Sequence, residues 1–94
     1  MADDIQYNLN VGRDRFEIYV GEELAGVIDY TDEDGILDLY HTGIEPEFGG
    51  RGLGTKLVEY ALSDCQDAEV KIRPTCPFIA KYIDAHPEYQ DLVA

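Results

Sequence analysis

Residues 48–65 read Phe48-Gly-Gly-Arg-Gly-Leu-Gly-Thr-Lys-Leu-Val-Glu-Tyr-Ala-Leu-Ser-Asp-Cys65, and this stretch decides the fold. Its first part holds four glycines in six positions, which is typical of a loop. Apolar residues then recur at helical spacing, at Leu53, Leu57, Val58, Ala61, Leu62 and Cys65. We therefore expect a glycine-rich loop that leads directly into a helix of about four turns.

The sequence before the loop predicts an antiparallel meander of three strands. Alternation places Phe16, Ile18 and Val20 on one face of a first strand. Turn residues at 21–23 and 32–35 then separate that strand from two more, over 24–30 and 36–44. Residues 1–13 are largely polar, and we expect them to be loosely ordered.

The sequence after the helix predicts a fourth strand and a second helix. Residues 69–73 alternate again, and an apolar pattern from Phe78 to Ile83 indicates a helix that ends near His86 and Pro87. A strand, a helix and a further strand form a right-handed crossover, so the fourth strand should run parallel to the third. The expected architecture is a single α+β domain over residues 1–94, in the order βββαβα.

The composition limits the classes of function that this protein can have. A chain of 94 residues can hold one domain, and no apolar run is long enough to span a bilayer. A net charge of −13 argues against binding to nucleic acid or anionic membranes. The first residues lack a basic segment followed by an apolar one, so we expect a cytoplasmic protein. Two cysteines and two histidines are too few for a disulfide framework or a zinc cluster, and no metal is expected.

The charge is unevenly distributed. Residues 1–50 hold two basic and 13 acidic residues, whereas residues 51–81 hold five basic and four acidic residues. The segment that begins with the glycine-rich loop can therefore tolerate an anion. The excess of Asp and the scarcity of Lys also suggest a protein adapted to high salt, where screening reduces self-repulsion.

The glycine-rich loop is a candidate anion site. Glycines ahead of a helix let several backbone N–H groups point at one ligand, and the helix N-terminus adds partial positive charge. The alternative is a merely flexible turn between strand and helix. A Walker loop is disfavoured because Thr55 and Lys56 stand in reversed order, and the spacing also fails the GxGxxG pattern of dinucleotide-binding folds.

The loop resembles the diphosphate-binding loop of the GCN5-related N-acetyltransferase family, (Gln/Arg)-x-x-Gly-x-(Gly/Ala). Gly52 and Gly54 occupy its glycine positions, while Gly49 stands where Gln or Arg is usual. The wider pattern is similar to the minimal YjdJ-type branch of that family and covers about residues 14–93. It comprises Tyr40-His-Thr42, Pro46-Glu47, Gly50-Arg-Gly-Leu-Gly54, Pro74-Thr-Cys-Pro-Phe78 and His86-Pro-Glu-Tyr89.

This resemblance implies acetyl-coenzyme A as co-substrate. Its diphosphate would lie on the backbone of Gly49, Gly50, Arg51, Gly52, Leu53, Gly54 and Thr55. Its pantetheine arm would lie along Thr42, Gly43 and Ile44, where the third and fourth strands separate. Larger family members carry additional N-terminal helices over the acceptor site, so here that site should be open or completed by another subunit.

Three residues are candidates for catalysis. Cys76 precedes Pro77, so we expect it to cap the second helix, which would lower the pKa of its thiol. A thiolate there could accept the acetyl group or act as an acid or base. The alternative is a small buried thiol that serves only packing. His41 shares strand parity with Leu37 and Leu39, so it is either a core histidine or a base for the amine. Tyr82 is the candidate acid by resemblance. Cys65 belongs to the apolar helix stripe and should be core.

The first functional hypothesis is therefore an acyltransferase that moves an acetyl group from acetyl-coenzyme A to an unidentified amine. The second is a coenzyme A-binding module without turnover, and the third is a nucleotide- or phosphate-binding interaction domain. A monomer or a homodimer is compatible with each.

Overall fold

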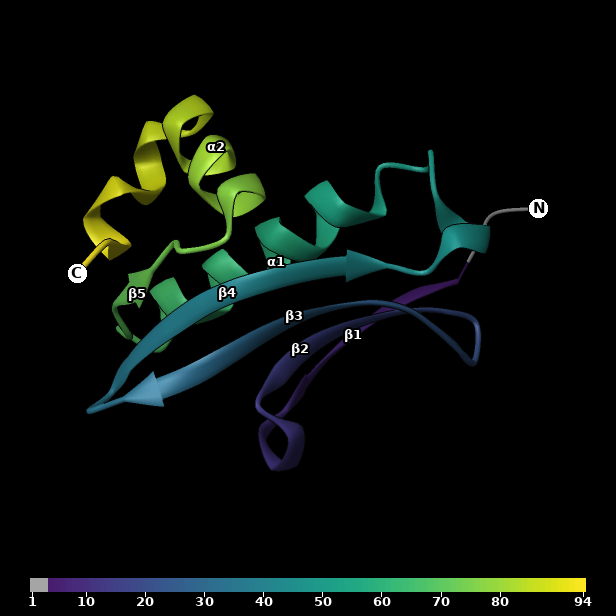
Figure 1. The fold of residues 1–94 in the computed structure, drawn as a ribbon, viewed down its shortest axis with the longest axis horizontal. Coiled ribbons are helices and arrows are strands. Elements are labelled where there is room, and N and C mark those ends of the chain that lie inside the picture. Colours follow the sequence, from purple (N-terminus) through teal and green to yellow (C-terminus); the bar gives the residue numbers. More distant parts are fainter. Residues whose placement is uncertain (1–3) are drawn as a thin grey trace.

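The computed structural model describes residues 4–94, whose strands form one sheet in the order β1-β2-β3-β4-β5 (Figure 1). The strands are β1 (Ile5–Asn10), β2 (Arg15–Val20), β3 (Glu23–Glu33), β4 (Ile36–Ile44) and β5 (Ile72–Arg73). The first four are antiparallel neighbours, whereas β5 pairs parallel to β4 at Leu37 and Asp38. The expected meander and the parallel crossover strand are both confirmed.

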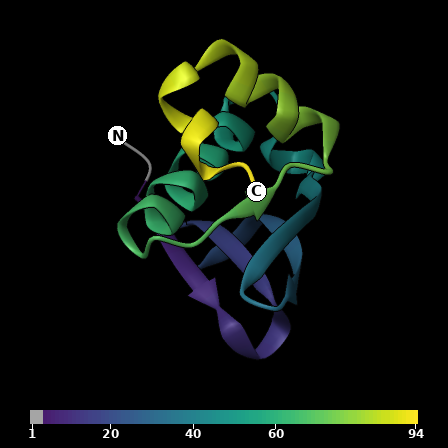
Figure 2. The same ribbon diagram turned by 90° about the vertical axis from the view of Figure 1, so that its left-hand side faces the viewer.

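Two helices pack on one face of this sheet, as Figures 1 and 2 show. They are α1 (Leu53–Asp67) and α2 (Pro77–Ala85). Helix α1 buries the whole apolar stripe from Leu53 to Cys65 against the sheet. From the strands, Phe16, Ile18, Ile28 and Leu39 contribute fully buried side chains to the same core. The apolar pattern of the sequence therefore correctly identified the face of α1 that meets the sheet.

The expectation of loosely ordered residues at 1–13 is wrong for β1, while residues 1–3 lie outside the described part of the chain. Ile5 and Leu9 pack against the core, and the Tyr7 ring stacks on Tyr60 of α1 at a centroid distance of 4.7 Å. On the opposite face, Asn8 and Asn10 hydrogen-bond Glu17 of β2. Contacts with distant residues stabilise this polar strand.

A β-bulge in β4 changes the direction of the residues after it. Asp29 of β3 pairs with His41 and Tyr30 pairs with Leu39, which leaves Tyr40 as an extra residue. Leu39 stays buried, but Tyr40 and His41 are exposed. The expectation of a core position for His41 is therefore wrong, because simple alternation does not hold across a bulge.

The end of the chain also differs from expectation. The segment predicted as a strand over 69–73 begins with the turn that caps the C-terminus of α1, since Glu69 is left-handed (φ 56°) and the Val70 N–H donates a hydrogen bond to the Cys65 carbonyl. Only Ile72–Arg73 pairs with β4. Beyond α2, a 3₁₀ helix (Pro87–Leu92) buries Tyr89 and Leu92. Ala94 then donates a hydrogen bond to Ile72.

Candidate functional site

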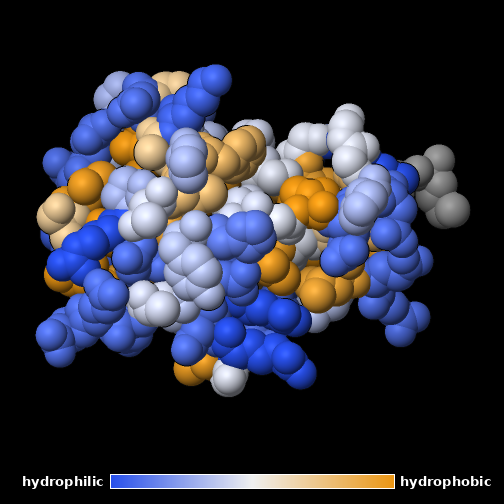
Figure 3. Space-filling view, viewed as in Figure 1, coloured by the Kyte–Doolittle hydropathy of each residue, from blue (hydrophilic) through white to orange (hydrophobic). Residues whose placement is uncertain are grey.

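A cavity of about 350 Å³ opens where the glycine-rich loop meets the end of β4. In Figure 3 apolar surface shows in this region, amid a largely hydrophilic face. The cavity is lined by eight of the ten residues expected to hold coenzyme A: Thr42, Ile44, Gly49, Gly50, Gly52, Leu53, Gly54 and Thr55. Phe48 and Phe78 complete the lining and were not among the expected residues.

The backbone of the loop takes conformations that favour glycine. Gly50 (φ 79°) and Gly52 (φ 73°) are left-handed, and Gly52 is the N-cap of α1. The first α1 hydrogen bond runs from the Lys56 N–H to the Gly52 carbonyl, 3.2 Å away. The N–H groups of Leu53, Gly54 and Thr55 therefore have no partner within the helix and lie at the cavity. This geometry and the helix dipole suit an anion.

At Gly54 the constraint is the close approach of a neighbouring side chain rather than a left-handed backbone. A Cβ atom there would lie 3.2 Å from Cζ of Phe78. The Phe78 ring of α2 therefore rests directly on the first turn of α1. Close packing at this point defines one wall of the cavity.

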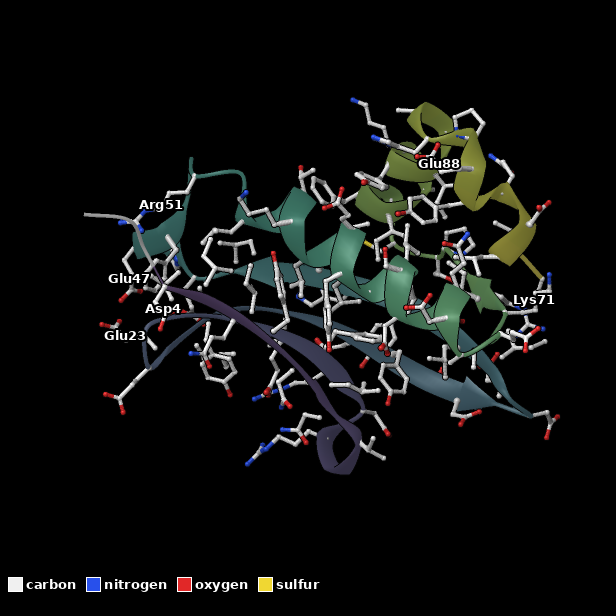
Figure 4. The ribbon with its side chains drawn as sticks, turned by 180° about the vertical axis from the view of Figure 1, so that it is seen from behind. Asp4, Glu23, Glu47, Arg51, Lys71 and Glu88 are labelled. Carbon is white, nitrogen blue, oxygen red and sulfur yellow. The ribbon has the colours of Figure 1, made fainter. Side chains whose placement is uncertain are left out.

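Arg51 does not line the cavity, although the resemblance placed it with the cofactor residues. Its guanidinium carbon lies 5.4 Å from the centroid of the Phe48 ring, a cation–π contact. Figure 4 shows Arg51 at the same end of the molecule as Asp4, Glu23 and Glu47. Gly43 is likewise absent from the lining, because its neighbours Thr42 and Ile44 face the cavity.

The edge of β4 that carries Thr42 and Ile44 is unpaired. Strand β5 pairs with Leu37 and Asp38, and the Cys76 N–H then donates to the Leu39 carbonyl at 2.9 Å. Past Leu39, no strand within residues 4–94 pairs with this edge, because the chain turns away into α2. The backbone of β4 is therefore available to hydrogen-bond an extended ligand arm.

Cys76 lies at the inner end of this edge. It is the N-cap of α2, as expected, with Pro77 at the first helical position. Its side chain is 6% exposed, and Sγ lies 3.5 Å from the Thr42 hydroxyl oxygen. Burial raises the pKa of the thiol, but hydrogen bonding with the Thr42 hydroxyl and with the backbone N–H groups of Ile79, Phe78 and Thr42 lowers it by more. The net effect is a thiol pKa below the ordinary value.

The thiol of Cys65 lies in an environment unlike that of Cys76. It is 2% exposed within α1, and burial together with the Asp64 carboxylate raises the pKa of its thiol to about 12. The expected assignment to the core is confirmed. Of the two free thiols, Cys76 is the one whose pKa is lowered.

Tyr82 lies in a neighbouring cavity of about 240 Å³. This second cavity shares Thr55 and Phe78 with the first and is also lined by Lys81, Tyr82, Ala85 and His86. The Tyr82 ring stacks on His86 at a centroid distance of 3.9 Å. Burial is the main cause that raises the pKa of Tyr82, and the Glu59 carboxylate raises it further, so the Tyr82 hydroxyl stays protonated. The structure does not bring Tyr82 into the first cavity.

His41 is not brought to the first cavity either. It is adjacent to Thr42 in β4, and neighbouring strand residues point to opposite faces. Thr42 faces the cavity on the helix side, so the imidazole projects from the open face of the sheet. There the imidazole lies over Gly43, where an added Cβ would be 3.0 Å from Nε2.

Residues 4–94 contain no group of three or more His, Cys, Asp or Glu residues placed to hold a metal ion. Among the helices of that range, none is long and apolar enough to cross a membrane.

Comparison with known proteins identifies relatives. Chicken (Gallus gallus), mouse (Mus musculus) and human (Homo sapiens) proteins named NATD1 are each 35% identical to the chain over 52 residues. The match covers 55% of this chain and about half of each relative, 46% of the human one.

A solved structure matches over a larger share of the chain. It is the NMR structure of a GCN5-like candidate N-acetyltransferase from Staphylococcus aureus, with a TM-score of 0.68 and 25% sequence identity. The match covers all of this chain and 91% of that one. A model of the family described as GCN5-related N-acetyl-transferase matches residues 15–92. The chain therefore belongs to the GCN5-related N-acetyltransferase family.

Proposed function

We propose that this protein transfers an acetyl group from acetyl-coenzyme A to an amine, and that the first cavity binds the coenzyme. The observation that carries the proposal is the continuity of three features: the glycine-rich N-terminus of α1, the unpaired edge of β4, and the Thr42–Cys76 contact. A diphosphate, an extended amide arm and a thioester occur in that order along acetyl-coenzyme A.

The diphosphate would accept hydrogen bonds from the N–H groups of Leu53, Gly54 and Thr55. The helix dipole adds about 0.3–1 kcal/mol for an exposed anion at such a terminus. The pantetheine amides would pair with the β4 backbone beside Thr42 and Ile44. The reactive carbonyl would then lie near Cys76, where N–H groups of β4 would stabilise developing negative charge on oxygen.

Two routes lead from this arrangement to the product. In the direct route, the amine attacks the thioester carbonyl carbon, the bond from that carbon to sulfur breaks, and coenzyme A leaves as a thiolate. In the covalent route, the Cys76 thiolate makes that attack first, and the amine then displaces the Cys76 sulfur. The depressed pKa of Cys76 supports the covalent route. Neither Tyr82 nor His41 lines the first cavity, so the proton donor to the leaving sulfur and the base for the amine are not assigned to them.

A second candidate function is a coenzyme A-binding module without turnover. It is favoured by the position of His41 on the open face of the sheet, away from the cavity. Within residues 4–94, no helix covers that face to enclose an acceptor (Figures 1 and 2). Turnover distinguishes the two candidates. A nucleotide-binding interaction domain is a weaker alternative, since neither standard phosphate-loop spacing fits.

The test is incubation with acetyl-coenzyme A, followed by intact-mass measurement and by transfer to a panel of primary amines. We expect an acetyl adduct that Cys76→Ala removes and that the matched variant Cys65→Ala retains. Transfer without an adduct would support the direct route. Coenzyme A binding with neither adduct nor transfer would instead support the binding module.

A further inference from the structure

We propose that the outer edge of β1 is a self-association surface, at which two copies of this chain pair their β1 strands antiparallel. Strand β1 lies at one end of the sheet, with β2 and β3 between it and β4. Pairing there leaves the first cavity open, because that cavity lies at the end of β4 and the start of α1. The inference therefore goes beyond the proposed function and does not depend on it.

Within residues 4–94, the outer edge of β1 lacks the features that usually keep a sheet edge from pairing with another chain, such as charged residues, proline, bulges or a covering segment. Residues Ile5–Asn10 include no charged residue and no proline, although 29% of the chain is charged. Their register with β2 is regular throughout. The opposite edge is covered, because Val93 bridges Ile72 of β5 and the Ala94 N–H donates a hydrogen bond to the Ile72 carbonyl.

The hydrogen bonds to β2 determine which backbone groups of β1 point outward. The Gly21 N–H donates to the Asp4 carbonyl at 2.7 Å, and the β1–β2 register places these two residues directly opposite each other. In an antiparallel pair, every second residue bonds the neighbouring strand. The even-numbered residues of β1 therefore bond β2. The residues whose N–H and C=O groups point away from β2 are Ile5, Tyr7 and Leu9.

These outward groups are symmetric about Tyr7, so a second copy related by a two-fold axis can pair with all of them. Tyr7 then lies opposite Tyr7 of the second copy, and Ile5 lies opposite Leu9, with two hydrogen bonds exchanged in each pair. An axis moved by one residue in either direction leaves one outward residue without a partner from β1. On the open face of the sheet, the amide side chains of Gln6 and Asn8 also meet. This match of the edge with itself identifies a second copy of the chain as the partner.

The Tyr7 side chain has surface left for that partner. Its ring stacks on Tyr60 of α1, and it is nevertheless 40% exposed. In the paired strands, the Tyr7 rings of the two copies lie side by side on the helix side of the joined sheet. Cross-strand aromatic pairs of this kind stabilise antiparallel pairing.

Charges at the two ends of β1 favour the same antiparallel arrangement. The first end carries Asp4, which lies at the same end of the molecule as Glu23 (Figure 4). The other end leads into a 3₁₀ turn (Val11–Arg13), in which the Arg13 N–H donates to Asn10 Oδ1 at 3.2 Å. Pairing about Tyr7 puts Asn10 of one copy opposite Asp4 of the other. Arg13 of each copy therefore approaches the acidic end of its partner.

Two measurements test the association and its location. Sedimentation equilibrium over a series of protein concentrations should show a monomer–dimer equilibrium. At high concentration, amide hydrogen exchange should be slowed at the three outward residues of β1, and dilution should abolish that protection. The even-numbered residues of β1 should stay protected at every concentration, because they bond β2. A chain that stays monomeric, or a dimer whose outward β1 amides exchange as in the monomer, would overturn the proposal.

A charge exchange tests the antiparallel register. Arg13→Glu should weaken dimerisation by roughly tenfold, because two attractive contacts become repulsive in each dimer. Asp4→Lys should weaken it to a similar extent. The double variant has the net charge of the wild type and should recover its affinity.

The matched control is Lys81→Glu, on an exposed residue of α2, which changes the net charge as Arg13→Glu does and should leave dimerisation unchanged to within about twofold. Thermal melts of each variant verify folding. A double variant that stays as weak as the single variants, or a control that weakens dimerisation as much as Arg13→Glu, would overturn the proposed pairing.

Discussion

Replacement of Glu17 by Gln should destabilise the protein in a strongly pH-dependent manner. Glu17 lies on the open face of the sheet and is 1% exposed. Its Oε1 accepts hydrogen bonds from Asn8 (3.0 Å) and Tyr19 (3.0 Å), and its Oε2 from Asn10 (3.1 Å) and Arg15 (2.7 Å). Burial raises the pKa of the carboxyl group, but these four bonds lower it by more, from 4.5 to about 2.

The size of the effect follows from this pKa difference. At 1.36 kcal/mol per pKa unit, the shift corresponds to about 3 kcal/mol of stability as an upper bound. Because the folded-state pKa is the lower one, this contribution is fully present above about pH 4.5 and is lost as the pH falls towards 2. The difference in unfolding free energy between wild type and Glu17→Gln should therefore be largest at neutral pH and shrink in acid.

Urea unfolding from pH 7 down to about pH 2 measures this difference. Glu22→Gln, in the exposed turn between β2 and β3, is the matched control and should change stability by less than about 0.5 kcal/mol at every pH. A stability difference for Glu17→Gln that stays constant across this range would refute the reasoning. So would a difference as small as that of the control.

Three further predictions concern the site and the surface. Thr42→Val should raise the pKa of Cys76 and slow its alkylation by iodoacetamide at neutral pH, whereas Thr42→Ser should retain the wild-type rate. Equal alkylation rates in the wild type and Thr42→Val would show that Thr42 does not activate the thiol. Gly52→Ala, at φ 73°, should cost about 1 kcal/mol of stability and weaken coenzyme A binding, while Gly49→Ala, at φ −64°, should be tolerated. Calorimetry measures the binding of both variants, and thermal melts measure their stability. Added salt should raise the melting temperature because it screens a net charge of −13, and a flat or falling trend would contradict the expected adaptation to high salt.

Much of the fold could be predicted because local pattern and tertiary packing agree. Helix α1 begins at Leu53 as expected, since the apolar stripe and the preceding glycines both indicate that start. Strand β1 was missed for the opposite reason. Its polar residues Asn8 and Asn10 are satisfied by Glu17, a partner that no local pattern reveals. Without that partner the segment has the composition of a loose terminus.

The candidate site was predicted in part. The glycines were found because a loop before a helix carries a local signature, whereas Thr42 was implied by the family resemblance. The bulge at Tyr40 leaves no such signature, so alternation placed His41 on the wrong face. The sequence identifies Phe78 only as one of the apolar residues that indicate α2, and its role as the wall between two cavities depends on how α1 and α2 pack. The sequence nevertheless contained a signal for this packing, because a glycine at position 54 leaves space for a large neighbouring side chain such as that of Phe78.

Binding of coenzyme A in the cavity at the start of α1 can be measured by amide NMR of this 94-residue chain during titration with coenzyme A. If the coenzyme binds there, the largest chemical-shift changes should occur at the N–H groups of Gly50 to Thr55 and at Thr42 and Ile44, with small changes across β1 and β2. Absence of shifts, or shifts confined to the open face of the sheet around Glu17, would contradict it.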